Sequence, residues 1–137
     1  MKGLHSYPSI FNLGHRQVHD ILSEPVIVQE KVDGSQFSFG VVSGVLKMRS
    51  KGAEVFAETT DKLFRPVVET ALRLHAEGKL TDGWTYRGEA ITKLKHNSLV
   101  YERTPAGFVI LFDIDTGNES YLTPNELVAE AARLGLE

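Results

Sequence analysis

The residues most able to do chemistry lie in one short segment, where a lysine follows a run of β-branched side chains and precedes an acid and a glycine. The segment reads Glu30, Lys31, Val32, Asp33 and Gly34. A lysine amine held at the end of a strand beside Asp33 can attack the α-phosphate of a nucleotide and form a phosphorus–nitrogen bond. Since an ordinary lysine, with a pKa of about 10.4, is protonated at neutral pH, this reaction needs positive neighbours or a metal ion. The alternative is a plain β-turn, for which Asp-Gly is a common pair, with Lys31 solvated.

Three later segments carry groups that suit a nucleotide. Arg49 and Lys51 can face phosphates or the 3′ hydroxyl of a ribose, and Glu89 can accept hydrogen bonds from ribose hydroxyls. Gly88 is expected to allow a ligand to approach the backbone closely. Phe112 can stack on a purine. Each group also has a structural alternative: solvated strand ends for the two cations, a surface acid on an edge strand for Glu89, and core packing for Phe112.

The elements that must position these groups follow from the apolar pattern, which predicts an α+β fold with antiparallel sheets and flanking helices. Strands are predicted over residues 25–31, 35–42, 45–49, 84–91 and 108–115. Ser43 and Gly44 predict a tight hairpin between the second and third of these. The last strand is nearly unbroken in its apolar character, so we expect it to be buried on both faces.

Two helices are predicted. The spacing of apolar residues favours one over residues 61–77, with Asp61 able to cap its start and Gly78 able to end it. Thr123 and Glu126 form a capping box with Pro124 between them, which predicts a second helix that reaches Gly135.

Composition limits the class of protein. The 137 residues suffice for one core, so we expect a single domain over residues 1–137, and 42% hydrophobic with 24% charged residues is typical of globular chains. The absence of cysteine excludes disulfides and thiolate chemistry. The net charge of −3 confines any nucleic-acid contact to a local patch. Without an apolar run of about 20 residues or a signal-peptide pattern, we expect no membrane contact and a cytoplasmic location.

The four chemical segments, in this order, resemble the motifs of the covalent nucleotidyltransferase superfamily, which holds DNA ligases, RNA ligases and mRNA capping enzymes. Residues 31–34 resemble motif I, residues 49–52 motif Ia, residues 86–89 motif III and residues 112–114 motif IIIa. Residues 96–105, running into residues 108–113, are most similar to the RNA ligase 2-like group. The resemblance spans residues 26–137 and implies a partial nucleotidyltransferase domain of the ATP-grasp-like ligase kind.

The resemblance implies a role for each matching residue. Lys31 is the nucleophile that carries AMP, in a motif that includes Asp33 and Gly34. Gln29 and Glu30 flank the adenine edge. The remaining nucleotide contacts are Glu89 at the ribose, Phe112 stacked on the adenine, and one cation of motif Ia, with Arg49 and Lys51 both open for that role because lysine cannot reproduce a guanidinium fork.

The resemblance also implies an ATP-dependent RNA ligase that uses Mg²⁺, forms lysyl-AMP and seals 5′-phosphate and 3′-hydroxyl RNA ends, as in RNA repair. The sequence lacks motif IV, a source of a metal-binding carboxylate, and motif V, a Lys-x-Lys strand that grips the triphosphate. We therefore expect weak or no activity from this chain by itself, and completion of its pocket by a C-terminal segment or a partner chain.

Several alternatives remain open. The chain can instead be a non-catalytic nucleotide- or RNA-binding module, or act like a capping enzyme or a DNA ligase. His15 and His19, at i and i+4, are a weak candidate metal pair because no third ligand is evident. A basic and aromatic cluster can touch RNA phosphates or remain a solvated loop, and it comprises Lys93, Lys95, Tyr101 and Arg103.

Overall fold

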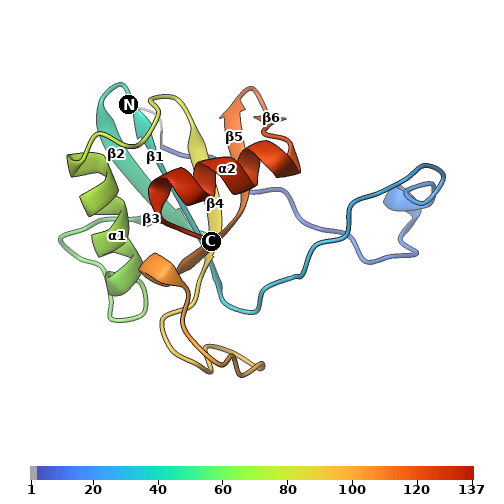
Figure 1. Ribbon diagram of the computed structural model, residues 1–137, viewed down its shortest axis with the longest axis horizontal. Helices are drawn as coiled ribbons and strands as arrows, with labels where there is room; N and C mark the ends of the chain where they lie inside the picture. Colours follow the sequence, from blue (N-terminus) through green and yellow to red (C-terminus); the bar gives the residue numbers. More distant parts are fainter. Residues whose placement is uncertain (1–2) are drawn as a thin grey trace.

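The structure is a computed structural model that describes residues 3–137, and its framework is one six-stranded antiparallel sheet. The strands are β1 (Ser35–Val42), β2 (Val45–Ser50), β3 (Glu54–Val55), β4 (Thr85–Ala90), β5 (Val109–Gly117) and β6 (Ser120–Tyr121). Their order across the sheet is β3-β2-β1-β4-β5-β6 (Figure 1). The α+β prediction is confirmed, with a single sheet in place of several.

The hairpin and both helices form close to where the sequence predicts them. Ser43 and Gly44 have φ values of 51° and 80°, as the two central residues of a tight hairpin turn require. The helices are α1 (Arg65–Ala76) and α2 (Pro124–Leu134). Helix α1 begins later than predicted, because Asp61 accepts the amide of Phe64 and so caps the turn that precedes the helix. The predicted capping box of α2 is present.

Both helices cover the same face of the sheet, and the core lies between them and the strands (Figure 1). The centre of this core is aromatic: Phe39 of β1 and Tyr86 of β4 stack with their ring centroids 5.3 Å apart. Leu74 of α1 and Leu134 of α2 reach the same cluster. Each helix therefore buries the apolar stripe of its amphipathic pattern against the sheet. Because both helices lie on the same face, the opposite face of the sheet carries no helix formed by residues 3–137 (Figure 1).

Two sequence predictions are wrong. The strand predicted over residues 25–31 does not form, and these side chains are exposed; the following strand β1 already has β2 and β4 on its two sides, so the segment cannot pair with it. Lys31 therefore follows an irregular segment and not a strand end. Strand β5 is buried on one face only, with Val109, Leu111 and Ile114 buried while Ile110 and Phe112 stay partly exposed.

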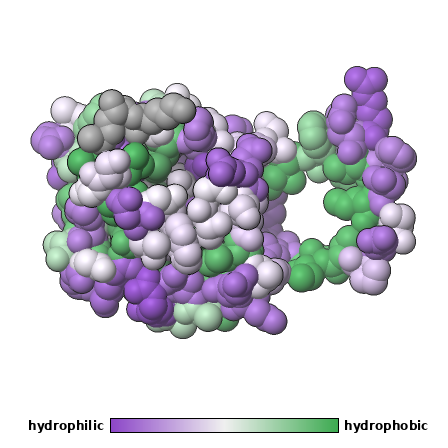
Figure 2. Space-filling model, turned by 90° about the horizontal axis from the view of Figure 1, so that it is seen from above, coloured by the Kyte–Doolittle hydropathy of each residue, from purple (hydrophilic) through white to green (hydrophobic). Residues whose placement is uncertain are grey.

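The chain between about residues 8 and 30 leaves the body of the protein as an extended arm, drawn in blue in Figure 1. Its only regular element is a single 3-10 turn, η1 (Arg16–Val18). Figure 2 shows the arm projecting from one side, with apolar and polar side chains mixed along it. Ile10, Leu13, Leu22, Ile27 and Val28 are all exposed there. Within residues 3–137, neither helix has the length and apolar character needed to cross a bilayer.

Candidate functional site

Polar side chains gather on the face of the sheet that the helices leave open, because paired rows of residues alternate between the two faces. The row through Phe39 is buried under the helices. The next row lies on the open face and runs across β2, β1, β4 and β5 through Arg49, Ser38, Arg87 and Asp113. Glu89 is two residues from Arg87 on β4 and so shares this face. The sheet thus brings two of the predicted site residues, Arg49 and Glu89, to one surface.

Residues 31–35, called the lysine turn below, contain Lys31 and are tied to strand β4 at Glu89. The amide of Gly34 donates a hydrogen bond to Glu89 Oε2 at 3.0 Å. A side chain at Gly34 does not fit, since a Cβ there would lie 2.3 Å from the carbonyl oxygen of Ala90. The segments that carry Lys31 and Glu89 are therefore neighbours in space. β4 is an interior strand, so Glu89 is not the acid on an edge strand that was the alternative reading.

Four charged side chains share this neighbourhood, those of Glu89, Asp33, Lys31 and Lys51, and the pKa shifts of the two carboxylates reflect their proximity. Burial raises the pKa of Glu89, while the Gly34 amide and the positive charges of Lys31 and Lys51 oppose that rise. The amides of Leu99 and Ser98 lower the pKa of Asp33, and Lys31 lowers it further. Glu89 is thus a carboxylate with a weakened preference for its ionised form, beside two exposed lysines.

The carboxylate of Asp33 is occupied by the protein itself. Its Oδ2 accepts the amides of Ser98 at 2.7 Å and Leu99 at 2.8 Å. Asp33 therefore stabilises the loop packed against the lysine turn, a role that sequence reasoning missed because the two partners are more than sixty residues away.

The first residues of the described chain lie across the open face, where their backbone carbonyls accept hydrogen bonds from two arginines. Arg49 Nη1 donates to the carbonyl of Leu4 at 2.8 Å, and Arg87 Nη1 donates to the carbonyl of His5. Arg87 is 2% exposed, and its Nε has no hydrogen-bond partner among the described residues. Lys51 lies beyond the end of β2 and is exposed. Of the two motif Ia candidates, Arg49 thus lies on the sheet face and is engaged by backbone oxygens.

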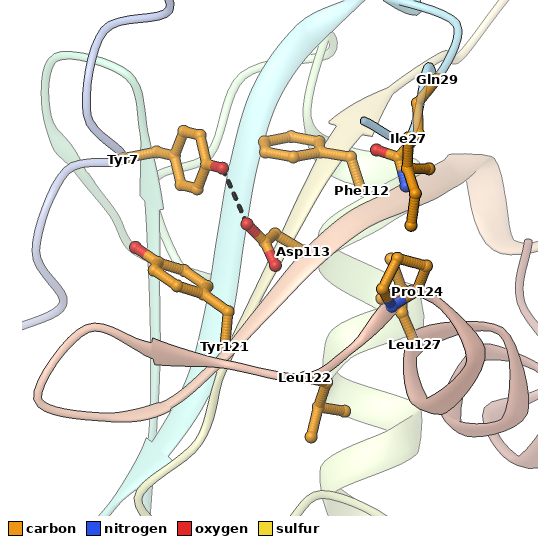
Figure 3. Close-up of a pocket in the computed structure, with 9 residues that line it drawn as sticks. All are labelled: Tyr7, Ile27, Gln29, Phe112, Asp113, Tyr121, Leu122, Pro124 and Leu127. Atoms are coloured by element: carbon orange, nitrogen blue, oxygen red, sulfur yellow. Dashed lines mark hydrogen bonds between the residues drawn. The ribbon is translucent and has the colours of Figure 1, made fainter. Parts of the chain in front are cut away.

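Phe112 lines a cavity and is not part of the core. Strand β5 has a bulge at this point, since Arg87 pairs with Asp113 while Gly88 pairs with Leu111, which leaves Phe112 without a partner on β4. A bulge re-aims the side chain of the extra residue. The cavity measures about 390 Å³ and is lined by Tyr7, Ile27, Gln29, Phe112, Asp113, Tyr121, Leu122, Pro124 and Leu127 (Figure 3).

Tyr7 forms one wall of this cavity. Its ring meets Phe112 edge-on, with centroids 5.0 Å apart, and its hydroxyl donates to Asp113 Oδ2 at 2.7 Å (Figure 3). Burial raises the pKa of Asp113, and burial together with the Asp113 carboxylate raises that of Tyr7. No sequence signal marks Tyr7, because it lies 106 positions from its partner.

The remaining predicted residues divide between the two parts of the site. Gln29 lines the cavity with Phe112, whereas Glu30 is exposed and does not line it. Gly88 is required for packing and not for ligand approach, because a Cβ there would lie 2.6 Å from a side-chain carbon of Val109. Arg87 was missed, although its place two residues before Glu89 was sufficient to put it on the same face.

The other candidates have local roles. His15 Nδ1 accepts the amide of Gln17, and the ring of His19 bonds the carbonyl of Arg16, so each ring belongs to its own turn. No group of three His, Cys, Asp or Glu side chains in residues 3–137 is placed to hold a metal ion. In the basic and aromatic cluster, Arg103 pairs with Glu137.

The fold and its open face define an α+β protein that combines cations and carboxylates beside a lysine turn. Within that class, the chain belongs to the RNA ligase family, whose model matches residues 24–137. The family match confirms the resemblance to RNA ligases. Comparison with curated proteins and with solved structures gave no match.

Proposed function

We propose that this chain is the nucleotide-transfer part of an ATP-dependent RNA ligase, with Lys31 as the residue that becomes adenylylated. The observation that carries the proposal is the hydrogen bond of 3.0 Å between the Gly34 amide and Glu89, which joins the lysine turn to the carboxylate on β4. Family membership supports the ligase class. A lysine supplies the amine to which the nucleotide is transferred, and a carboxylate can accept hydrogen bonds from the ribose hydroxyls.

The proposed reaction has three steps. The unprotonated amine of Lys31 attacks the α-phosphorus of ATP, a phosphorus–nitrogen bond forms, the bond to pyrophosphate breaks, and the nitrogen gives up a proton to solvent. The 5′-phosphate of an RNA end then attacks the same phosphorus and releases the lysine. A 3′ hydroxyl finally attacks the 5′-phosphate, AMP leaves, and a phosphodiester joins the two ends.

The protein's own groups suggest how ATP would lie. Glu89 would accept hydrogen bonds from the ribose, and Phe112 would contact the base in the cavity that Gln29 also lines. These parts are adjacent on the sheet, since Glu89 pairs with Ile110 and Arg87 with Asp113 on either side of Phe112. Arg49 would meet phosphate or ribose after release of the Leu4 carbonyl.

The resemblance implies a magnesium ion, but the residues present do not fit one as a resident group. The Asp33 carboxylate is occupied by two amides, and the described residues hold no cluster of three suitable ligands. The proposed reaction therefore uses no metal ion that this chain holds by itself.

The test is incubation with ATP labelled at the α-phosphate, with Mg²⁺ added, followed by a denaturing gel and mass spectrometry. Because the chain lacks motifs IV and V, we expect a weak label on the protein. It should map to Lys31, be lost in Lys31→Arg and persist in Lys62→Arg, an exposed lysine before α1. A label elsewhere, or no label on the protein, would overturn the proposal. Parallel reactions with GTP, and transfer to 5′-phosphorylated DNA in place of RNA, separate it from a capping enzyme or a DNA ligase.

A second candidate function is a non-catalytic nucleotide- or RNA-binding module. It is favoured by the carbonyls of Leu4 and His5, which occupy Arg49 and Arg87 on the face where ATP would react. This function predicts that ATP raises the Tm without labelling the protein, and that Lys31→Ala keeps the effect.

A further inference from the structure

Residues 94–101 form a loop that closes on itself beside the lysine turn. The amide of Tyr101 donates to the carbonyl of Leu94 at 2.8 Å, which joins the two ends of the loop. Ser98, Leu99 and Val100 at its tip are exposed, and none of the loop's side chains belongs to the core. Core packing therefore does not explain what this loop does.

The polar groups of the loop are directed at the backbone of the lysine turn. The amide of Asp33 donates to the Tyr101 hydroxyl at 2.8 Å, and Asn97 Nδ2 donates to the carbonyl of Gly34 at 2.9 Å. The Asp33 carboxylate accepts two amides of the loop in return. The loop thus binds both the backbone and the side chain of the turn, over separations of more than sixty residues.

His96 adds a contact whose direction can be assigned. Its Nδ1 accepts the amide of Thr92 at 3.3 Å, and since an amide can only donate, the proton of the neutral ring must lie on Nε2. Nε2 then donates to Ser35 Oγ at 2.9 Å. Burial and the nearby charge of Lys93 lower the pKa of His96, which favours the neutral ring that this arrangement requires.

We propose that residues 96–101 are a clasp that fixes the turn carrying Lys31, with Tyr101 and His96 as positioning residues for the reaction of the lysine. The clasp rests on the proposed function, since it acts through the nucleophile assigned there. Lys31 is itself exposed and lies two residues from Asp33, so the position of its amine depends on how firmly the turn is held. Fixing a nucleophile within reach of its target accelerates reaction by reducing the entropy lost at the transition state.

Substitutions in the loop can distinguish a clasp from a contact surface for RNA, because the two roles affect different steps. A loop that touches RNA phosphates would affect RNA binding and leave formation of lysyl-AMP untouched. A positioning loop would slow the attack on ATP at saturating nucleotide and leave ATP affinity nearly unchanged.

The first experiment compares Tyr101→Phe with Tyr86→Phe. Tyr86 is a matched control because its hydroxyl also accepts a backbone amide, that of Thr81 at 3.1 Å, but on the helix-covered face of β4. We expect Tyr101→Phe to slow lysyl-AMP formation about tenfold at saturating ATP with the Kd for ATP within about twofold, as for one lost positioning contact. Tyr86→Phe should leave both values unchanged. Equal rates in the two variants would overturn the clasp.

The second experiment asks whether a conservative change at His96 restores function. His96→Gln keeps a donor within reach of Ser35, whereas His96→Ala does not. We expect the Gln variant to recover much of the rate that the Ala variant loses. Equal losses in the two variants would contradict the positioning role.

A third measurement does not depend on activity. Amide hydrogen exchange should be faster at Asp33 in Tyr101→Phe and faster at Thr81 in Tyr86→Phe, because each variant removes the acceptor of that amide. If the wild type formed no lysyl-AMP while Asp33 exchange rose as expected, the proposed function would fail and the clasp would stand as a device that orders the turn. Unchanged exchange at Asp33 would overturn the clasp even if the protein is active.

Discussion

The amide of Gly34 and the carboxylate of Glu89 are joined at 3.0 Å, although they lie 55 positions apart in the chain. This bond places the turn after Lys31 against an interior strand of the sheet. It also gives Glu89 a structural function, holding the backbone of the turn, beside the ribose contact proposed for the same carboxylate. The two functions can be separated by substitution.

Glu89→Gln should preserve stability, whereas Glu89→Ala should not. The amide oxygen of Gln can still accept from Gly34, but Ala leaves that amide without its acceptor, which costs about 1 kcal/mol in the free energy of unfolding. Urea unfolding at pH 7 measures both variants. A loss in Gln as large as in Ala would contradict the hydrogen bond.

The unfolding free energies of the wild type and Glu89→Gln should differ in their pH dependence. Burial raises the pKa of Glu89 in the folded state, so its contribution to stability is fully present below the unfolded pKa, near 4.3, and declines as pH rises through the folded pKa. The difference in unfolding free energy between wild type and Glu89→Gln should therefore shift in favour of Gln as pH increases from about 4 to 7.

Gly34→Ala should destabilise the protein by about 1–3 kcal/mol, because the added methyl group would lie 2.3 Å from the carbonyl oxygen of Ala90. Gly52→Ala is the matched control, since nothing lies within 4 Å of a Cβ there. The control should change the unfolding free energy by less than about 0.5 kcal/mol. Equal effects of the two changes in urea unfolding would show that the close approach at Gly34 does not matter.

A chain that begins at Ser6, and so keeps Tyr7 in the cavity wall, should bind ATP about tenfold more tightly than the full chain, a difference of about 1.4 kcal/mol. Under the proposed function, ATP has to displace the carbonyl of Leu4 from Arg49, and the carbonyl of His5 lies beside it on Arg87. Leu4→Ala keeps the carbonyl and should bind as the wild type does. Isothermal titration measures each Kd, and weaker binding by the shortened chain would instead make Leu4 and His5 part of the ATP site.

Glu137→Gln should cost about 0.5 kcal/mol at pH 7, a small value because both partners of the Arg103–Glu137 ion pair are partly exposed. Arg103 lowers the pKa of Glu137 to about 2. Because this pKa lies below the unfolded value, the contribution is present above about pH 4.3 and is lost as pH falls towards 2. Urea unfolding at pH 3 and 7 checks this, with Glu58→Gln as an exposed control that should show no such change.

Sequence reasoning succeeded where a short stretch of chain determines its own conformation. The hairpin at Ser43 and Gly44 follows from backbone preferences, and the start of α2 follows from the capping box at Thr123. It failed over residues 25–31, whose β-branched composition favours a strand but which pair with no strand of the sheet. A strand requires a partner, so local composition cannot determine whether one forms.

The sequence by itself determined the family, the order of the chemical segments and the positions of the helices, because residue type and spacing carry that information. Only the tertiary structure decided that the loop at residues 96–101 holds the turn after Lys31, that residues 4–7 engage Arg49 and Arg87, and that Phe112 faces a cavity. These relationships consist of hydrogen bonds and packing between segments far apart in the chain. They arise only when the sheet is assembled, because its pairing register decides which side chains share a face.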